Sequence, residues 1–170
     1  MDHFARLGLP AALELEPATL DRAYFALQRQ WHPDRFVAKP PEERARASAE
    51  AAALNDAYRT LKDPLSRAFY LAVLKGVELP GDGKTIDDPE LLMEAMEARE
   101  ELHEARTIVA VEELAARSSD DMKKSLGGLG SLFLANDKAA IRKALLRLRY
   151  LDKFAEEARA RRTNIERARA

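Results

Sequence analysis

Apolar side chains recur at helical spacing along two stretches of the first 62 residues. The first stretch carries Leu20, Tyr24, Leu27 and Trp31, at spacings of 4, 3 and 4 residues. The second repeats the pattern at Ala47, Ala51, Leu54, Tyr58 and Leu61. Such stripes put apolar groups on one helix face, which a lone helix cannot bury. We therefore predict two helices that pack against each other as an antiparallel hairpin.

Prolines mark the ends of these helices. The first helix begins at Glu16-Pro17 or Thr19, and Pro33 ends it, because the residue before a proline avoids helical backbone. Pro41 opens the second hairpin helix after a loop of about residues 32–40. Two further helices are predicted in this half, at residues 2–9 and from Asp63-Pro64 to about Lys75.

The second half predicts a separate helical bundle. Residues 76–86 are rich in turn-forming residues and are the expected linker. Asp88-Pro89 opens the next helix, the pattern allows breaks near Thr107 and Ser118-Ser119, and a last helix begins near Asp137. The predicted fold is all-α and L-shaped or elongated, with no strand pattern. Its parts are an N-terminal domain over 1–75, the linker over 76–86 and a three-helix bundle over 87–170.

Two features of the bundle fit this pattern poorly. Gly127-Gly128 and Gly130 fall within the middle helix, where each glycine costs about 1 kcal/mol relative to alanine. A broken or bent helix is therefore expected there. Five arginines also gather near the C-terminus, at positions 159, 161, 162, 167 and 169, and predict a frayed, solvated helix end.

Composition narrows the function classes. Hydrophobic residues make up 46% of the chain and charged residues 34%, which is typical of a folded, soluble protein. A net charge of -1 predicts neither nucleic acid nor an acidic membrane as a partner. The absence of cysteine excludes disulfides and thiolate metal sites and suits a reducing compartment. With neither a secretory signal nor an apolar run of about 18 residues, a cytoplasmic monomer is expected.

The tripeptide His32-Pro33-Asp34 lies in the loop between the paired helices. Taken alone it is ordinary turn chemistry, because proline and aspartate are common loop residues. Here it directly follows a helix that ends Gln28-Arg29-Gln30-Trp31, and a matching helix follows it. This arrangement, over residues 1 to about 75, resembles the J-domain of DnaJ-type co-chaperones.

The resemblance implies that the tripeptide docks on a DnaK-type chaperone and stimulates its ATPase. Asp34 would offer a carboxylate to an arginine of the partner, a charge-assisted contact of about 1.5–3 kcal/mol. Pro33 would fix the loop backbone, and His32 would hold the loop through a hydrogen bond. Arg22 and Arg29 share a solvent face of the preceding helix and would extend the docking surface; the alternative is an ordinary solvated face.

The second half narrows the resemblance to the HscB family, the J-type co-chaperones of bacterial iron–sulfur cluster assembly. The residues that carry it are Leu91-Leu92-Met93-Glu94, Arg99-Glu100-Glu101-Leu102 and Leu148-Arg149-Tyr150-Leu151-Asp152-Lys153. Members of this family deliver the scaffold protein IscU to the chaperone HscA. The resemblance implies that scaffold contacts are made by Leu92, Met93, Met96, Glu97, Glu100, Glu104 and Tyr150.

Spacing is consistent with one binding face. Residues 93, 97, 100 and 104 step by four or three, so they lie along one side of a helix. Apolar anchors with a rim of carboxylates suit protein recognition. The alternative is that Leu92, Met93 and Met96 are bundle core and that the glutamates only solvate the helix.

Rival functions have weaker support. Gly83-Lys84-Thr85 matches the end of a phosphate-binding loop. However, Glu78 stands at the position where that motif requires its first glycine, and the segment follows a predicted helix instead of a strand. The histidines at 3, 32 and 103 lack zinc-site spacing, and no nucleophile motif is present, so we expect no enzyme, metal or cofactor. Two alternatives stay open: a general J-domain adaptor with another client, and a plain helical interaction or nucleic-acid-binding protein.

Overall fold

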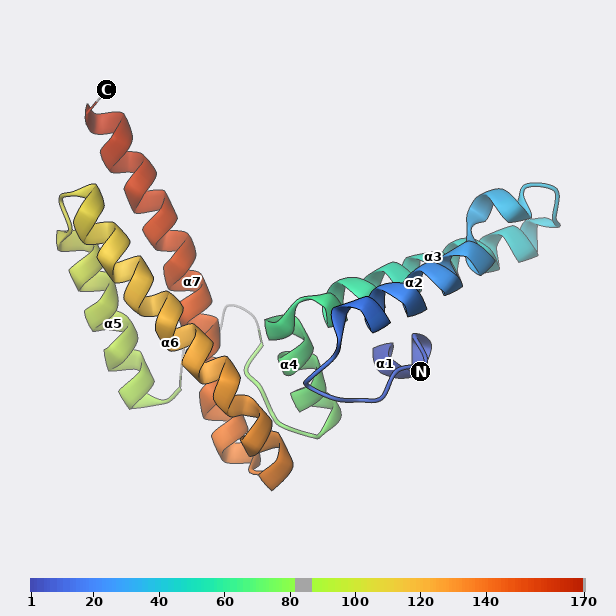
Figure 1. The fold of residues 1–170 in the computed structure, drawn as a ribbon, viewed down its shortest axis with the longest axis horizontal. Coiled ribbons are helices and arrows are strands. Elements are labelled where there is room, and N and C mark those ends of the chain that lie inside the picture. Colours follow the sequence, from blue (N-terminus) through green and yellow to red (C-terminus); the bar gives the residue numbers. More distant parts are fainter. Residues whose placement is uncertain (82–86, 170) are drawn as a thin grey trace. The chain divides into compact units, whose positions relative to one another are not determined.

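In the computed structural model, which describes residues 1–81 and 87–169, the secondary structure of these residues is helical (Figure 1). Seven α-helices and one short 3-10 helix, and no strand, occur among these residues. The all-α prediction is confirmed. The chain divides into two compact units, Met1–Leu74 and Lys75–Ala170.

The first unit is built around a helical hairpin. Its elements are α1 (His3–Arg6), α2 (Pro17–Trp31), η1 (Pro33–Phe36), α3 (Pro41–Lys62) and α4 (Pro64–Leu74). Helix α3 contacts all four of the others. Its buried face consists of Ala47, Ala51, Leu54, Ala57 and Leu61. Phe4, Leu20 and Leu71 are buried in the same unit, at 1–2% exposure.

The predicted apolar stripe of α3 is buried except at Tyr58, whereas that of α2 is buried only at Leu20. Ala57 is fully buried, whereas Tyr58 is only half-buried. The Tyr24 and Tyr58 rings stack with centroids 4.0 Å apart, so both tyrosines bridge the helices near the surface. Tyr24 donates to Asn55 Oδ1 at 2.7 Å, and Tyr58 donates to Asp21 Oδ1 at 2.7 Å. Polar aromatic contacts therefore join α2 to α3 where small alanines leave little apolar surface.

The second unit contains α5 (Pro89–Glu104), α6 (Ile108–Ala135) and α7 (Lys138–Arg169). Helix α7 packs against both α5 and α6. Its buried residues are Ile141, Leu145, Leu146, Leu148, Tyr150, Leu151, Phe154, Ala158 and Ile165. Asp88 caps α5 by accepting hydrogen bonds from the N–H groups of Glu90 and Leu91, as the Asp-Pro motif predicts.

Helix α6 is continuous, which corrects two expectations. A break does occur near Thr107, which caps α6, but none occurs at Ser118-Ser119 or across Gly127-Gly128 and Gly130. Ser118 before the glycines, Leu129 between them and Phe133 after them are buried, so tertiary packing anchors the helix on both sides of the glycines. Packing of an apolar face outweighs weak intrinsic helix propensity over such a short segment.

The arginine-rich end also differs from the frayed helix that was expected. Helix α7 extends to Arg169, whose side chain lies outside the described part. Arg161 donates to the backbone carbonyls of His103 and Ala105, at 2.9 and 3.0 Å. It therefore caps the C-terminal end of α5, where carbonyl groups lack partners within the helix. Arg162 pairs with Glu112 and Glu166.

Part of the expected linker is held against the second unit. Val77 is buried, and Arg142 and Arg149 of α7 donate to the backbone carbonyls of Glu78 and Pro80, at 3.1 and 3.0 Å. The rest of the expected linker, with Gly83-Lys84-Thr85, lies outside the described residues. None of the described helices has the length and apolarity needed to cross a bilayer.

The glycines of α6 yield a stability prediction. A Cβ added at Gly127 or Gly128 would meet no atom within 4 Å. Gly127→Ala and Gly128→Ala should each stabilise the second unit by about 0.5–1 kcal/mol, because alanine has the higher helix propensity. Urea unfolding, monitored by hydrogen exchange of the α6 amides, would measure the change in unfolding free energy.

Gly76→Ala is the matched control in the same unit. Gly76 has φ +73° and would place a Cβ 3.3 Å from Lys138 Nζ, so alanine there should destabilise. Unchanged stability in both α6 variants would show that the two glycines do not weaken the helix.

Two candidate interaction sites

The first candidate site is the turn at the end of α2. His32 has extended backbone, and Pro33 opens the 3-10 helix η1. The backbone N–H of Asp34 donates to His32 Nδ1 at 3.3 Å. Arg35 Nη1 donates to the carbonyl of Arg29 at 3.0 Å, which ties η1 back to the last turn of α2. The Asp34 side chain is 86% exposed, so this carboxylate projects from a held backbone.

Aromatic packing holds the turn on the hairpin. The rings of Trp31 and Phe36 are nearly parallel, with centroids 6.0 Å apart and an interplanar angle of 2°. The guanidinium of Arg46, on α3, lies 5.6 Å from the centre of the Trp31 ring, within the range of a cation–π contact. Both ends of the turn are therefore attached to the hairpin.

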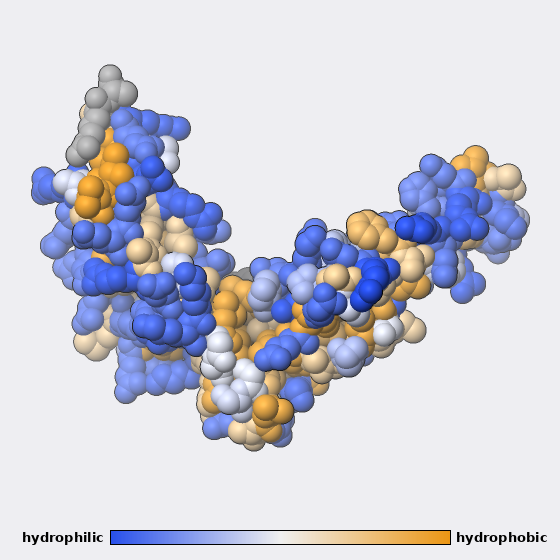
Figure 2. Space-filling model, viewed as in Figure 1, coloured by the Kyte–Doolittle hydropathy of each residue, from blue (hydrophilic) through white to orange (hydrophobic). Residues whose placement is uncertain are grey.

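A shallow groove adjoins the turn. It is lined by Tyr24, Phe25, Gln28, Arg29, His32 and Arg35. Phe25 is 53% exposed, a large apolar group on the solvent side of α2. Figure 2 shows apolar residues interspersed among hydrophilic ones on the visible surface of this unit. The sequence analysis did not identify Phe25 or Arg35 as candidate site residues. Phe25 could have been found, because it is a large apolar residue outside the predicted buried stripe of its helix.

The two predicted arginines of α2 are both exposed, in different surroundings. Arg29 lines the groove and accepts, through its carbonyl, the hydrogen bond from Arg35. Arg22 lies two turns earlier and donates to Thr19 Oγ1 at 3.1 Å, with Glu16 at 3.9 Å. Only Arg29 lies beside the turn.

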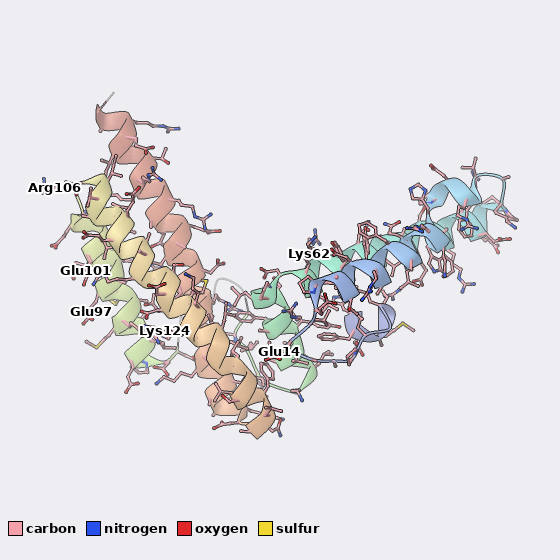
Figure 3. All side chains as sticks on the ribbon, viewed as in Figure 1. Glu14, Lys62, Glu97, Glu101, Arg106 and Lys124 are labelled. Atoms are coloured by element: carbon pink, nitrogen blue, oxygen red, sulfur yellow. The ribbon has the colours of Figure 1, made fainter. Side chains whose placement is uncertain are left out.

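The second candidate site is the outer face of α5. Met93 and Met96 are 63% and 60% exposed, which is unusual for such large apolar side chains. Glu97, Glu100 and Glu104 are exposed on the same face. Figure 3 labels Glu97 on α5. The methionines are therefore not bundle core, whereas Leu92 is half-buried at the flank of this face.

Tyr150 is placed differently from the other predicted scaffold residues. It comes from α7 and is only 9% exposed. Its hydroxyl donates to Glu94 Oε1 at 3.2 Å, and Arg147 donates to the same oxygen at 2.6 Å. Tyr150 thus contacts the inner side of α5, and it shares a cavity lining with Glu97 but with neither methionine.

A metal site in the described part of the chain would require several ligating side chains close together. Within residues 1–81 and 87–169 no group of three or more ligating side chains could hold a metal ion. His3 stacks on Tyr70 with ring centroids 4.3 Å apart, and partial burial lowers its pKa. Its position is explained by packing at the base of the hairpin.

The hairpin, its exposed histidine–proline–aspartate turn and the attached three-helix unit define a J-domain protein with a second helical domain. The DnaJ domain family matches residues 2–70. The family described as "HSCB C-terminal oligomerisation domain" matches residues 87–159.

Whole-chain relatives agree with this class. The co-chaperone protein HscB homolog of Burkholderia multivorans is 38% identical over 167 residues, covering 96% of this chain and 95% of the relative. That of Bordetella petrii is 40% identical over 163 residues, covering 95% and 96%. The chain belongs to the HscB family of co-chaperones, which confirms the resemblance seen in the sequence.

Solved structures share the fold. Chaperone HscB from Vibrio cholerae superposes with a TM-score of 0.83 at 32% identity, covering 97% of this chain and 99% of that one. Human co-chaperone protein HscB gives a TM-score of 0.87 at 30% identity, covering 94% and 81%.

Tyr150 yields a pH prediction. Burial, and then the charge of Glu94, raise the pKa of the Tyr150 phenol to about 12. In the unfolded chain the phenol pKa is about 10. Its contribution to stability is therefore complete below about pH 10 and is lost as pH rises towards about 12, because the unfolded state releases the proton first.

The wild type should lose on the order of 2 kcal/mol of unfolding free energy relative to Tyr150→Phe between about pH 8 and pH 12. Urea titrations of both proteins at each pH separate the contribution of the Tyr150 phenol from those of other titrating groups, which the two proteins share. Parallel stability curves across that range would show that the phenol ionises equally readily in both states.

Proposed function

We propose that this chain stimulates ATP hydrolysis by a DnaK-type chaperone, HscA, and delivers the iron–sulfur scaffold protein IscU to it. The chain itself catalyses no reaction in this proposal and acts in the cytoplasm, where the absence of cysteine suits a reducing environment. The observation that carries the proposal is the exposed, internally hydrogen-bonded turn at His32–Asp34, in a chain related to HscB proteins over nearly its whole length.

The chaperone contact follows from the geometry of the turn. The Asp34 carboxylate is exposed while its backbone is held by His32, so little ordering entropy remains to be lost on docking. A charge-assisted hydrogen bond to a partner arginine is worth about 1.5–3 kcal/mol. Arg29, with Arg22 further along α2, would guide an acidic partner surface to the turn.

The scaffold contact follows from the outer face of α5. Two methionines exposed by more than half offer flexible, polarisable anchors for an apolar partner surface. Glu97, Glu100 and Glu104 supply a charged rim along the same face. The alternative function, a general J-domain adaptor with another client, would explain neither this exposed face nor the match of residues 87–159 to the HSCB C-terminal domain family.

The nucleic-acid alternative has little support. Arg161 is engaged with α5 carbonyls and Arg162 with Glu112 and Glu166. Engaged side chains offer few free charges for phosphate contacts, which dominate nucleic-acid affinity.

Changing the turn should abolish chaperone stimulation. Asp34→Asn removes the carboxylate charge, and His32→Gln removes the ring nitrogen that accepts the Asp34 N–H. Both variants should fold normally and retain scaffold binding, because neither side chain is buried. Steady-state ATPase assays with the chaperone would measure the loss.

Asp56→Asn is a matched control for charge removal, since Asp56 is an exposed aspartate of the same unit, on α3. It should stimulate the chaperone as the wild type does. Full stimulation by Asp34→Asn would refute the chaperone mechanism.

Polar replacement of the exposed methionines should weaken scaffold binding. Met93→Ser with Met96→Ser should reduce affinity for the scaffold by roughly tenfold or more, because buried apolar anchors dominate interface energy. Scaffold-independent stimulation of the chaperone should be unchanged. Isothermal titration calorimetry with the purified scaffold protein would measure the affinity.

Leu134→Ser provides the control, because Leu134 is 90% exposed on α6 of the same unit. An equal loss of affinity in Leu134→Ser, or no loss in the methionine variant, would argue against the α5 face.

A further inference from the structure

A cavity of about 210 Å³ lies among α5, α6 and α7 on the flank of the α5 outer face. Its floor is apolar and consists of Ala98, Leu114, Leu151 and Phe154. Glu97 belongs both to this lining and to the exposed face that carries Met93 and Met96. The cavity is therefore continuous with the proposed scaffold-binding surface.

The cavity wall is strongly acidic. Its lining holds four carboxylates, Glu94, Glu97, Glu101 and Asp121, but Arg117 alone among cations. Two of the carboxylates are occupied. Glu94 accepts from Arg147 and Tyr150, and Glu101 accepts from Arg117 at 2.9 Å.

The other two carboxylates accept no side-chain hydrogen bond among the described residues. Glu97 has no ion-pair partner in the part of the chain that the structure describes. Asp121 has its nearest cations, Lys124 and Arg147, both at 3.9 Å, the outer limit of an ion pair. The cavity thus offers two carboxylates that accept no hydrogen bond among the described residues, together with an apolar floor.

Ser118 adds an unpaired hydroxyl to the cavity lining. It is 93% buried, lines the cavity, and has no hydrogen-bond partner among the described residues. It is also the one buried polar residue of the described chain. Among the described residues, the one fully enclosed side-chain polar atom without a partner is Arg67 Nε, so the Ser118 hydroxyl is not sealed off, and a ligand or water in the cavity can hydrogen-bond to it.

We propose that this cavity receives the side chain of a lysine or arginine from the bound scaffold protein. The aliphatic stem of that side chain lies on the apolar floor, and its cationic head contacts Asp121, Glu97 and the Ser118 hydroxyl. Long basic side chains are suited to such a site because they combine an apolar stem with a charged end. The proposal rests on the proposed scaffold-binding function and adds a charge-specific pocket to it.

Small cations test the chemistry of the cavity on the full chain. n-Butylammonium and n-butylguanidinium should shift the NMR resonances of the Leu114 and Ser118 amides and of the Tyr150 ring, in a saturable manner. Asp121→Asn should weaken this binding at least threefold. Asp120→Asn is the matched control, because Asp120 is exposed next to Asp121 and does not line the cavity. The absence of saturable shifts, or equal loss in both variants, would overturn the proposal.

Scaffold binding tests the source of the basic group. Asp121→Asn and Ser118→Ala should lower scaffold affinity threefold to tenfold, while Ser118→Ala leaves the stability of the second unit unchanged or higher. Asp121 is partly exposed, so its variant should fold normally. A residue kept only for packing would show the reverse, with stability lost and affinity retained.

The outcomes separate this proposal from the broader one. Weaker binding by the methionine variant but not by Asp121→Asn or Ser118→Ala would overturn the pocket and leave scaffold binding intact. Cation binding without any effect on scaffold affinity would assign the cavity to a free amine and overturn the scaffold as its source. Unaltered affinity in every variant would refute both.

Discussion

Packing of α2 against α3 is the constraint on which the His32–Asp34 turn depends. Each helix has one apolar face, and the small alanines of α3 allow the two helices to approach closely. Stacked tyrosines, an amide hydrogen bond and the Trp31–Phe36 pair add to this aliphatic burial. Because the turn is fixed at both ends to this hairpin, Asp34 can be exposed and still keep a defined backbone.

In the second unit α7 has the corresponding role, since both α5 and α6 pack on it. Ion pairs join α5 to α7 at Glu90–Lys143, Glu94–Arg147 and Arg99–Glu157. Exposed pairs of this kind contribute only about 0–1 kcal/mol each, so the apolar core around Leu102, Val111 and Phe154 provides most of the stability. Burial of Leu91, Ala95 and Leu102 orients α5, which leaves Met93 and Met96 exposed on its other side.

The two units divide the proposed work between two kinds of surface. The turn presents one carboxylate on a rigid backbone, which suits recognition by a cation at a defined position. The α5 face presents flexible methionines with a carboxylate rim, which suits a broader apolar contact. Exposed acidic groups at both sites also make electrostatic attraction to partners dependent on ionic strength.

Periodicity and proline placement were enough to predict the helices, because helix formation and termination depend on neighbouring residues along the chain. Asp88-Pro89 and Pro33 mark boundaries that the structure retains, and the His-Pro-Asp tripeptide identified the turn. The continuity of α6 through Gly127-Gly128 could not be predicted in this way, since it depends on burial of Leu129 and Phe133. Nor could the partners of Arg161, the inward position of Tyr150 or the cavity at Ser118 be found from spacing. Each depends on contacts between side chains that are distant in sequence. Such contacts form only when the helices pack, so the local sequence pattern does not predict them.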